Sequence, residues 1–222
     1  MTSQAHEFQY YFDEMKSIWG EMSEGRRIIP FCTPVIRNPK FLVISTNHSE
    51  HFAYKDPARS DEISDAFAMK IPTDCNSYIH HDHGFARGLQ NLAGSAQAKY
   101  PEFKISQEWV GTNRCAIQTP DGGLDYLSGN PRFLDCQKRM DKLLKKFIAD
   151  IKPKNVILSG LHASKLYYLG DLQHMHCKKV LFGKGSSETF NLIPLWNASY
   201  FPNARKSSER LLQAIEDGFC KF

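Results

Sequence analysis

The chain has 222 residues, of which 41% are hydrophobic and 12% aromatic, and this is enough to form one domain with a substantial core. No apolar run approaches the roughly eighteen residues of a membrane span, and the early acidic residues Glu7, Asp13 and Glu14 are not expected in a secretory signal. Six cysteines without a CxxC pair predict free thiols in a cytoplasmic protein. We expect a single domain over 1–222 and a monomer.

The net charge of +4 is unevenly distributed along the chain. Residues 129–222 contain 16 Lys and Arg against 8 Asp and Glu, whereas residues 1–128 contain 12 against 16. A basic C-terminal half favours a polyanionic partner such as nucleic acid. The alternative is a solvated helix face, because five of the positive residues fall on one expected helix: Lys138, Arg139, Lys142, Lys145 and Lys146.

Hydrophobic periodicity predicts the following elements in the first half: a helix over about 4–22 within an N-terminal cap and lead-in (1–39), a strand over 40–46, a helix near 83–99 and a strand over 109–119 with a polar interruption. The span 48–78 is rich in charge, Pro and Ser, and it is expected to be loop-like apart from the apolar patch "AFAMKIP".

In the second half, Asn130 and Pro131 are expected to cap and begin a long amphipathic helix. The later elements are expected to be strands over 154–160, 178–182 and 191–196, with helices from about His162 and Lys206. Strands that alternate with helices predict an α/β fold. We expect a three-layer αβα sandwich with a central, mainly parallel sheet of about four to five strands.

Three polar segments follow expected strands: Ser45–His48, Thr112–Asn113 and Asn197–Ser199. In open α/β sheets, ligands bind outside the carboxyl ends of the strands. The three segments therefore predict a site at that edge of the sheet.

Four motifs in order carry a family resemblance: "STNH", "WVGTNR", "KPKNVILSGLHA" and "NASYFPNARKS". Together they resemble the motifs of the uracil-DNA glycosylase superfamily, over most of the chain after Lys40. The resemblance implies a monofunctional DNA glycosylase that hydrolyses the N-glycosidic bond of a flipped-out pyrimidine and leaves an abasic site. It implies DNA as the partner, and we expect no cofactor and no metal.

The resemblance also implies roles for residues around the base. Asn47 would hold the attacking water, because an amide does not titrate and cannot act as a general base. His48 could add acid–base help near neutral pH. Asn197 would donate to the departing base, and Asn113 would read its Watson–Crick edge. The flipped ring would stack on Phe67, with Phe52 as the alternative.

Ser49 stands where the uracil-specific branch carries a Tyr that blocks the pyrimidine C5 edge. The pocket is therefore expected to admit 5-substituted or hypermodified cytosines as well as uracil, in DNA repair or in anti-phage defence. Phosphate contacts are expected from four residues: Ser199, Arg205, Lys206 and Ser207. Tyr200 or Phe201 would wedge into the base stack.

Several alternatives stay open. Ser45, His48 and Ala198 depart from the Gly and Pro residues of the family motifs, so a catalytically inactive DNA-binding module of the same fold is the main alternative. "IHHDHGF" and "HMHC" could hold zinc, but the i, i+4 spacing of a helical site is absent. An iron–sulfur cluster would have only Cys32, Cys115 and Cys136 near suitable positions. A Rossmann-like enzyme would lack its glycine motif.

Overall fold

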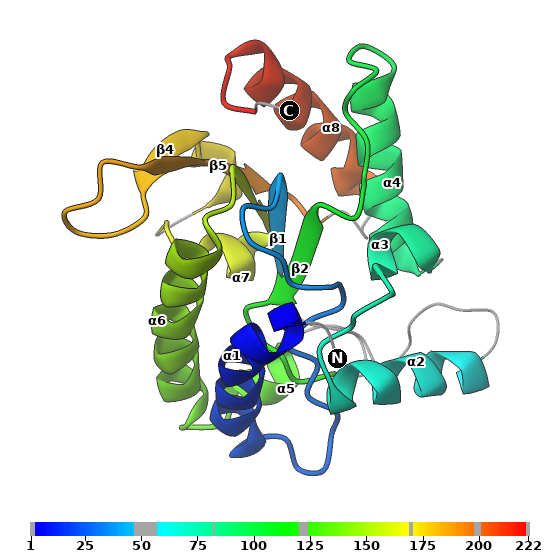
Figure 1. The fold of residues 1–222 in the computed structure, drawn as a ribbon, viewed down its shortest axis with the longest axis vertical. Helices are drawn as coiled ribbons and strands as arrows, with labels where there is room; N and C mark the ends of the chain where they lie inside the picture. The colour runs from blue at the N-terminus through cyan, green and yellow to red at the C-terminus, as the bar shows by residue number, and fades with distance from the viewer. Residues whose placement is uncertain are drawn as a thin grey trace.

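The computed structural model describes residues 3–46, 57–81, 83–119, 124–168, 171–197 and 201–220. A five-stranded sheet in the order β2-β1-β3-β5-β4 forms its centre (Figure 1). The strands are β1 (Phe41–Ser45), β2 (Trp109–Asn113), β3 (Asn155–Ser159), β4 (Lys178–Leu181) and β5 (Thr189–Leu195).

Four of the strands run parallel. β1 pairs with β2 and with β3, and β3 pairs with β5, all in parallel register. Only the edge strand β4, within the described residues, runs antiparallel, beside β5. Every residue of β1, β2 and β3 is buried, as expected when both faces of a sheet are covered.

Helices cover both faces of the sheet. They are α1 (Ser3–Gly20), α2 (Pro57–Met69), α3 (Ser77–His80), α4 (Gly84–Gln97), α5 (Asp125–Ser128), α6 (Phe133–Ile151), α7 (Leu161–Ser164) and α8 (Phe201–Glu216). Helices α1 and α6 pack together on one face, and α4 and α8 pack together on the other (Figure 1). The expected α/β architecture, a three-layer αβα sandwich with a mainly parallel sheet, is confirmed.

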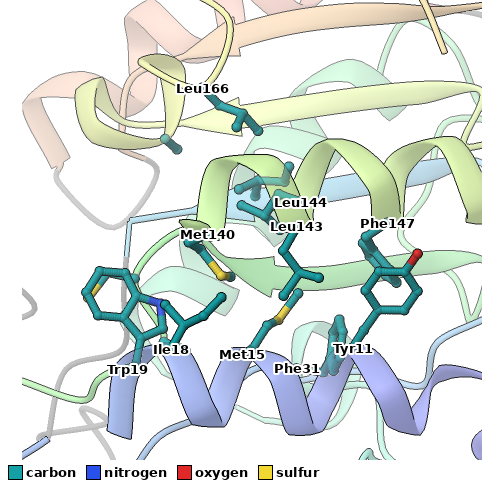
Figure 2. Packing of buried hydrophobic residues seen from close by; sticks show 14 of the residues in the cluster. Tyr11, Met15, Ile18, Trp19, Phe31, Met140, Leu143, Leu144, Phe147 and Leu166 are labelled. Carbon is teal, nitrogen blue, oxygen red and sulfur yellow. The ribbon is translucent and has the colours of Figure 1, made fainter. Parts of the chain in front are cut away.

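The first core lies between the sheet and the α1–α6 pair. Helix α1 contributes Tyr11, Met15 and Trp19, which point toward Met140 and Phe147 of α6 (Figure 2). The Tyr11 and Phe147 rings meet edge to face, with centroids 5.1 Å apart. The helix predicted over 4–22 is thus a covering element of the sheet, because its apolar stripe has a partner stripe on α6.

The second core lies on the opposite face. Successive strand residues alternate between the two cores, so Leu42 belongs to the first and Phe41 and Val43 belong to the second. Phe41 stacks on Trp109 of the neighbouring strand, with ring centroids 4.2 Å apart.

Three boundaries differ from the sequence-based expectation. The span 48–78, expected to be loop-like apart from the patch "AFAMKIP", contains helix α2 and the beginning of α3. Helix α6 begins at Phe133, because Pro131 and Arg132 form a turn in which the Asn130 side chain accepts a hydrogen bond from the Arg132 amide. Helix α8 begins at Phe201, five residues before Lys206, so the last motif enters a helix earlier than expected. No helix in the described part of the chain is long and apolar enough to span a membrane.

Candidate functional site

The carboxyl ends of the four parallel strands lie at one edge of the sheet. Ser45, the last residue of β1, is in register with Asn113, the last residue of β2. Ser159 of β3 is likewise in register with Leu195 of β5. The polar segments that follow these strands therefore begin side by side, as expected for segments at the carboxyl ends of parallel strands.

Gly160 brings two of these segments together. A Cβ atom at this position would lie 3.2 Å from Oγ1 of Thr46 and 3.7 Å from Cβ of Asn197. Its φ of +93° belongs to backbone that L residues rarely adopt. The loop after β1, the turn after β3 and the loop after β5 thus meet at a residue that has no side chain.

Asn113 is held in one orientation. It is 1% exposed. Its Nδ2 donates to the carbonyl of Ile29 at 3.3 Å, and its Oδ1 accepts from the hydroxyl of Ser45. Because a carbonyl only accepts hydrogen bonds, the atom facing Ile29 must be the NH₂ group. Each polar atom of the amide keeps capacity for one more hydrogen bond.

Arg114, the next residue, is a functional candidate that the sequence did not reveal. Its guanidinium is buried and forks onto Asp141 of α6, with both N–O distances 2.7 Å. The third nitrogen donates to the carbonyl oxygen of His162 at 2.6 Å. The sequence did contain a signal, because Asp141 is the only acidic residue in the stretch 138–146 that holds the five cations of that helix.

His162 lies just after Gly160 and is half-buried. Its Nδ1 is buried and has no hydrogen-bond partner among the described residues. Burial lowers the pKa of His162, and the positive charges of Lys165 and Arg114 lower it further, against an opposing effect of Asp125. The imidazole is therefore neutral at neutral pH.

The start of the loop after β5 is held by hydrogen bonds to the Trp196 carbonyl and by packing of Arg210 on the Trp196 ring. The Trp196 carbonyl accepts hydrogen bonds from the hydroxyls of Ser159 and Ser207, at 3.5 and 3.1 Å. The guanidinium of Arg210 lies 4.0 Å from the centroid of the Trp196 ring and donates to the carbonyl of Pro194. These contacts set where Asn197 leaves the sheet.

The edge therefore carries hydroxyl and amide groups that do not titrate near neutral pH, with cations behind them. No protein-family model matches the chain, and no curated protein matches it. Function has to be inferred from the chemistry of this edge.

The residues predicted to bind phosphate divide into two groups. Arg205 is 89% exposed and pairs with Glu209 at 2.8 Å, and Lys206 is exposed nearby. Ser207 is fully buried and donates to the Trp196 carbonyl, so its prediction as a phosphate contact is wrong. In a helix that begins at Phe201, position 207 faces the sheet.

Phe67, predicted to stack on a base, is a core residue. It is 4% exposed and belongs to the second core, with its ring centroid 5.7 Å from that of His81. A base needs an open ring face for stacking, and the Phe67 ring offers none, so this prediction is wrong.

Several predicted residues lie outside the described part of the chain: Asn47, His48, Ser49, Phe52, Ser199 and Tyr200. Phe201 is described only as the first residue of α8. The proposed roles of these residues remain predictions.

The histidine-rich segment 80–83 has structural contacts. The amide of Ala86 donates to Nδ1 of His83, which caps α4, so Nε2 carries the proton toward Ser77 at 2.7 Å. Nε2 of His81 lies 3.3 Å from the Cys75 sulfur. Within the described residues no three His, Cys, Asp or Glu side chains are grouped to hold a metal.

Burial raises the pKa of the Cys115 thiol to about 12.

Proposed function

We propose that the protein is a DNA glycosylase that hydrolyses the N-glycosidic bond of a flipped-out pyrimidine and leaves an abasic site. The substrate base would be uracil or a 5-substituted cytosine. The observation that carries the proposal is the meeting of three strand-end segments at Gly160, where Thr46 and Asn197 both lie close to the position that a Cβ atom would occupy. Ser45, which precedes Thr46, bonds to Asn113. These segments come from the motifs that resemble the uracil-DNA glycosylase superfamily.

The reaction requires little titrating chemistry at this edge. The bond between C1′ and the base nitrogen breaks with both electrons leaving on the base, and a water oxygen bonds to C1′. The proton that the water loses passes to solvent, and the departing base nitrogen takes up a proton, so that the products are the free base and a C1′ hydroxyl. The enzyme must stabilise negative charge on the base and hold that water. Asn197 would donate to the base, and Asn47, next to Thr46, would hold the water.

Asn113 would read the base through its remaining donor and acceptor. Uracil presents N3–H and carbonyl oxygens, whereas cytosine presents an unprotonated N3 and an amino group. An amide free to rotate would accept either edge. The Ile29 carbonyl fixes the orientation of the Asn113 amide. From one side, the amide would therefore match the hydrogen-bonding edge of either uracil or cytosine, but not both.

Arg205 and Lys206 support the choice of DNA as the partner. Both are exposed on the first two turns of α8, directly after the segment that contains Asn197. Cations in this position would contact phosphates on either side of an extruded nucleotide. Arg210 behind them packs on Trp196 and lends the surface further positive charge.

The test is incubation of the purified protein with duplex and single-stranded oligonucleotides that carry one defined base. Uracil, 5-hydroxymethylcytosine, glucosylated 5-hydroxymethylcytosine and unmodified cytosine form the set, and alkali then cleaves any abasic site. Scission at one modified base and none at cytosine is the expected result. The variant Asn47→Ala should abolish scission while DNA retention persists. Full activity of that variant would contradict the role given to Asn47.

A second candidate is a DNA-binding module without catalysis. The observation that favours it is that Asn113 is 1% exposed and both of its polar atoms bond within the protein. Such a protein would retain DNA in a gel-shift assay and leave every base of the oligonucleotide set in place. The same experiment therefore separates the two functions.

A further inference from the structure

Arg114 connects four parts of the fold at the candidate site. Its backbone amide donates to the carbonyl of Ser45 at 2.9 Å, joining the ends of β2 and β1. Its side chain reaches Asp141 on α6 and the carbonyl of His162 in α7. Through its backbone amide and its buried guanidinium, Arg114 therefore links the ends of β1 and β2 to helix α6 and to the turn after β3.

The geometry requires an arginine. Three acceptor oxygens surround the group at 2.6 to 2.7 Å, two from the Asp141 carboxylate and one from the His162 carbonyl. A planar guanidinium offers donors in a fixed fork that matches a carboxylate and leaves a further nitrogen for a third acceptor. A lysine ammonium is a single point of charge and lacks that geometry.

We infer that Arg114 is the positioning residue of the site, which fixes Asn113, the loop that begins at Thr46 and the turn at Gly160 in the arrangement that acts on the base. This inference rests on the proposed function. Arg114 would not contact the DNA itself. It would act through Asn113, its neighbour in the chain, and through the carbonyl of His162.

The surrounding bonds show why its loss would reach the site. The amide of Cys115, the next residue, donates to the carbonyl of Thr46 at 2.8 Å. Two successive backbone bonds thus hold Ser45 and Thr46 against the end of β2. On the other side, Gly160 lies close to Thr46 and Asn197, and the carbonyl of His162, two residues later, ties the α7 turn to Arg114.

Two variants separate positioning from simple charge balance. Arg114→Lys keeps a cation beside Asp141 but cannot reach all three acceptors. The double variant Arg114→Met/Asp141→Leu removes both charges, so that no unpaired charge is left buried and the chain can fold. The control is Arg139→Met, on the same helix as Asp141, which breaks an exposed ion pair between Arg139 and Glu21.

With a cleavable oligonucleotide, the expected result is a fall in kcat of about 100-fold for both variants, because a displacement near 1 Å is enough for a loss of this size. KM should stay within about threefold of the parent value, since no group that binds DNA is removed. The control should match the parent. A kcat within about threefold of the parent in Arg114→Lys or in the double variant would overturn the inference.

A second measurement decides the inference even if no oligonucleotide is cleaved. Hydrogen exchange of the Arg114 and Cys115 amides, which bond to Ser45 and Thr46, should accelerate by at least about tenfold in the double variant and not in the control. Unchanged exchange at both amides would show that the loop after β1 is held without Arg114. Absence of cleavage by the parent would instead reject the glycosylase function alone.

Discussion

Substitution of Gly160 by Ala tests the closest approach at the site. The residue has φ +93° and ψ 162°, a region that is essentially restricted to glycine. A side chain there would also place Cβ 3.2 Å from Oγ1 of Thr46, which is closer than an ordinary contact. The backbone strain alone is worth on the order of 1–3 kcal/mol.

We therefore expect Gly160→Ala to lower the free energy of unfolding by about 2–3 kcal/mol, because the strained backbone and the tight contact act together. For a domain of this size, that corresponds to a fall in Tm of about 4–12 °C. Urea denaturation followed by tryptophan fluorescence gives the free energy, and a thermal scan gives Tm. Cleavage activity should decrease by more than the folded fraction does, since the added Cβ displaces Thr46.

Gly94→Ala is the matched control. Gly94 lies on the exposed side of α4, and a Cβ there would meet no atom within 4 Å. The same chemical change should stabilise the protein by about 0.5–1 kcal/mol, because alanine favours helical backbone. If Gly160→Ala is as stable as the parent, or if the two variants shift stability in the same direction, the packing described at Gly160 is wrong.

Three further predictions concern charge, titration and packing. Arg205→Ala should weaken DNA binding and reduce the slope of log K against log[salt] by about 0.9. Glu209→Gln should strengthen DNA binding, because it releases Arg205 from its ion pair. Equal salt slopes for the parent and both variants would exclude Arg205 as a phosphate contact. The pKa of His162 is lowered in the folded protein, so the unfolded chain binds the proton more readily, and stability should fall as the pH drops below 6.5. His162→Gln should flatten that part of the curve of unfolding free energy against pH. An unchanged curve would contradict the burial of the ring. Gly111→Ala should prevent stable folding, because its Cβ would lie 2.2 Å from the buried Tyr78 hydroxyl; a cooperative unfolding transition at the parental Tm would refute that contact.

The sheet could be predicted from the sequence because each parallel strand is a short, continuous apolar run. Burial on both faces removes the need for alternation, so "FLVIS" and "NVILS" read directly as central strands. The polar residues that end them were equally visible. Their meeting at one edge follows from parallel pairing, and the register of Ser45 with Asn113 bears it out.

Helix α2 was missed because its stability comes from elsewhere in the chain. Its sequence, "PARSDEISDAFAM", carries charges and serines in place of a clear apolar stripe. Arg27 pairs with Asp61 and Asp65, and the hydroxyl of the buried Ser64 accepts a hydrogen bond from Gln118. Contacts of this kind join residues that are 34 to 54 positions apart. Local propensity could not reveal them.

The same limit applies to the site, where the decisive group is a main-chain carbonyl. Sequence alone placed Asn113 at the end of a strand but left its amide free to present either edge. The carbonyl of Ile29, 84 residues earlier, removes that freedom, and the hydroxyl of Ser45 completes the orientation. Main-chain carbonyls are present at every position and carry no sequence signal. If the protein acts on a pyrimidine as proposed, its preference for one edge of the base is expected to depend on the path of the backbone near residue 29. Ser45→Ala, which keeps the Ile29 bond, should leave the choice between uracil and cytosine unchanged, and a variant that accepted both bases equally would show that the hydroxyl, and not the carbonyl, orients the amide.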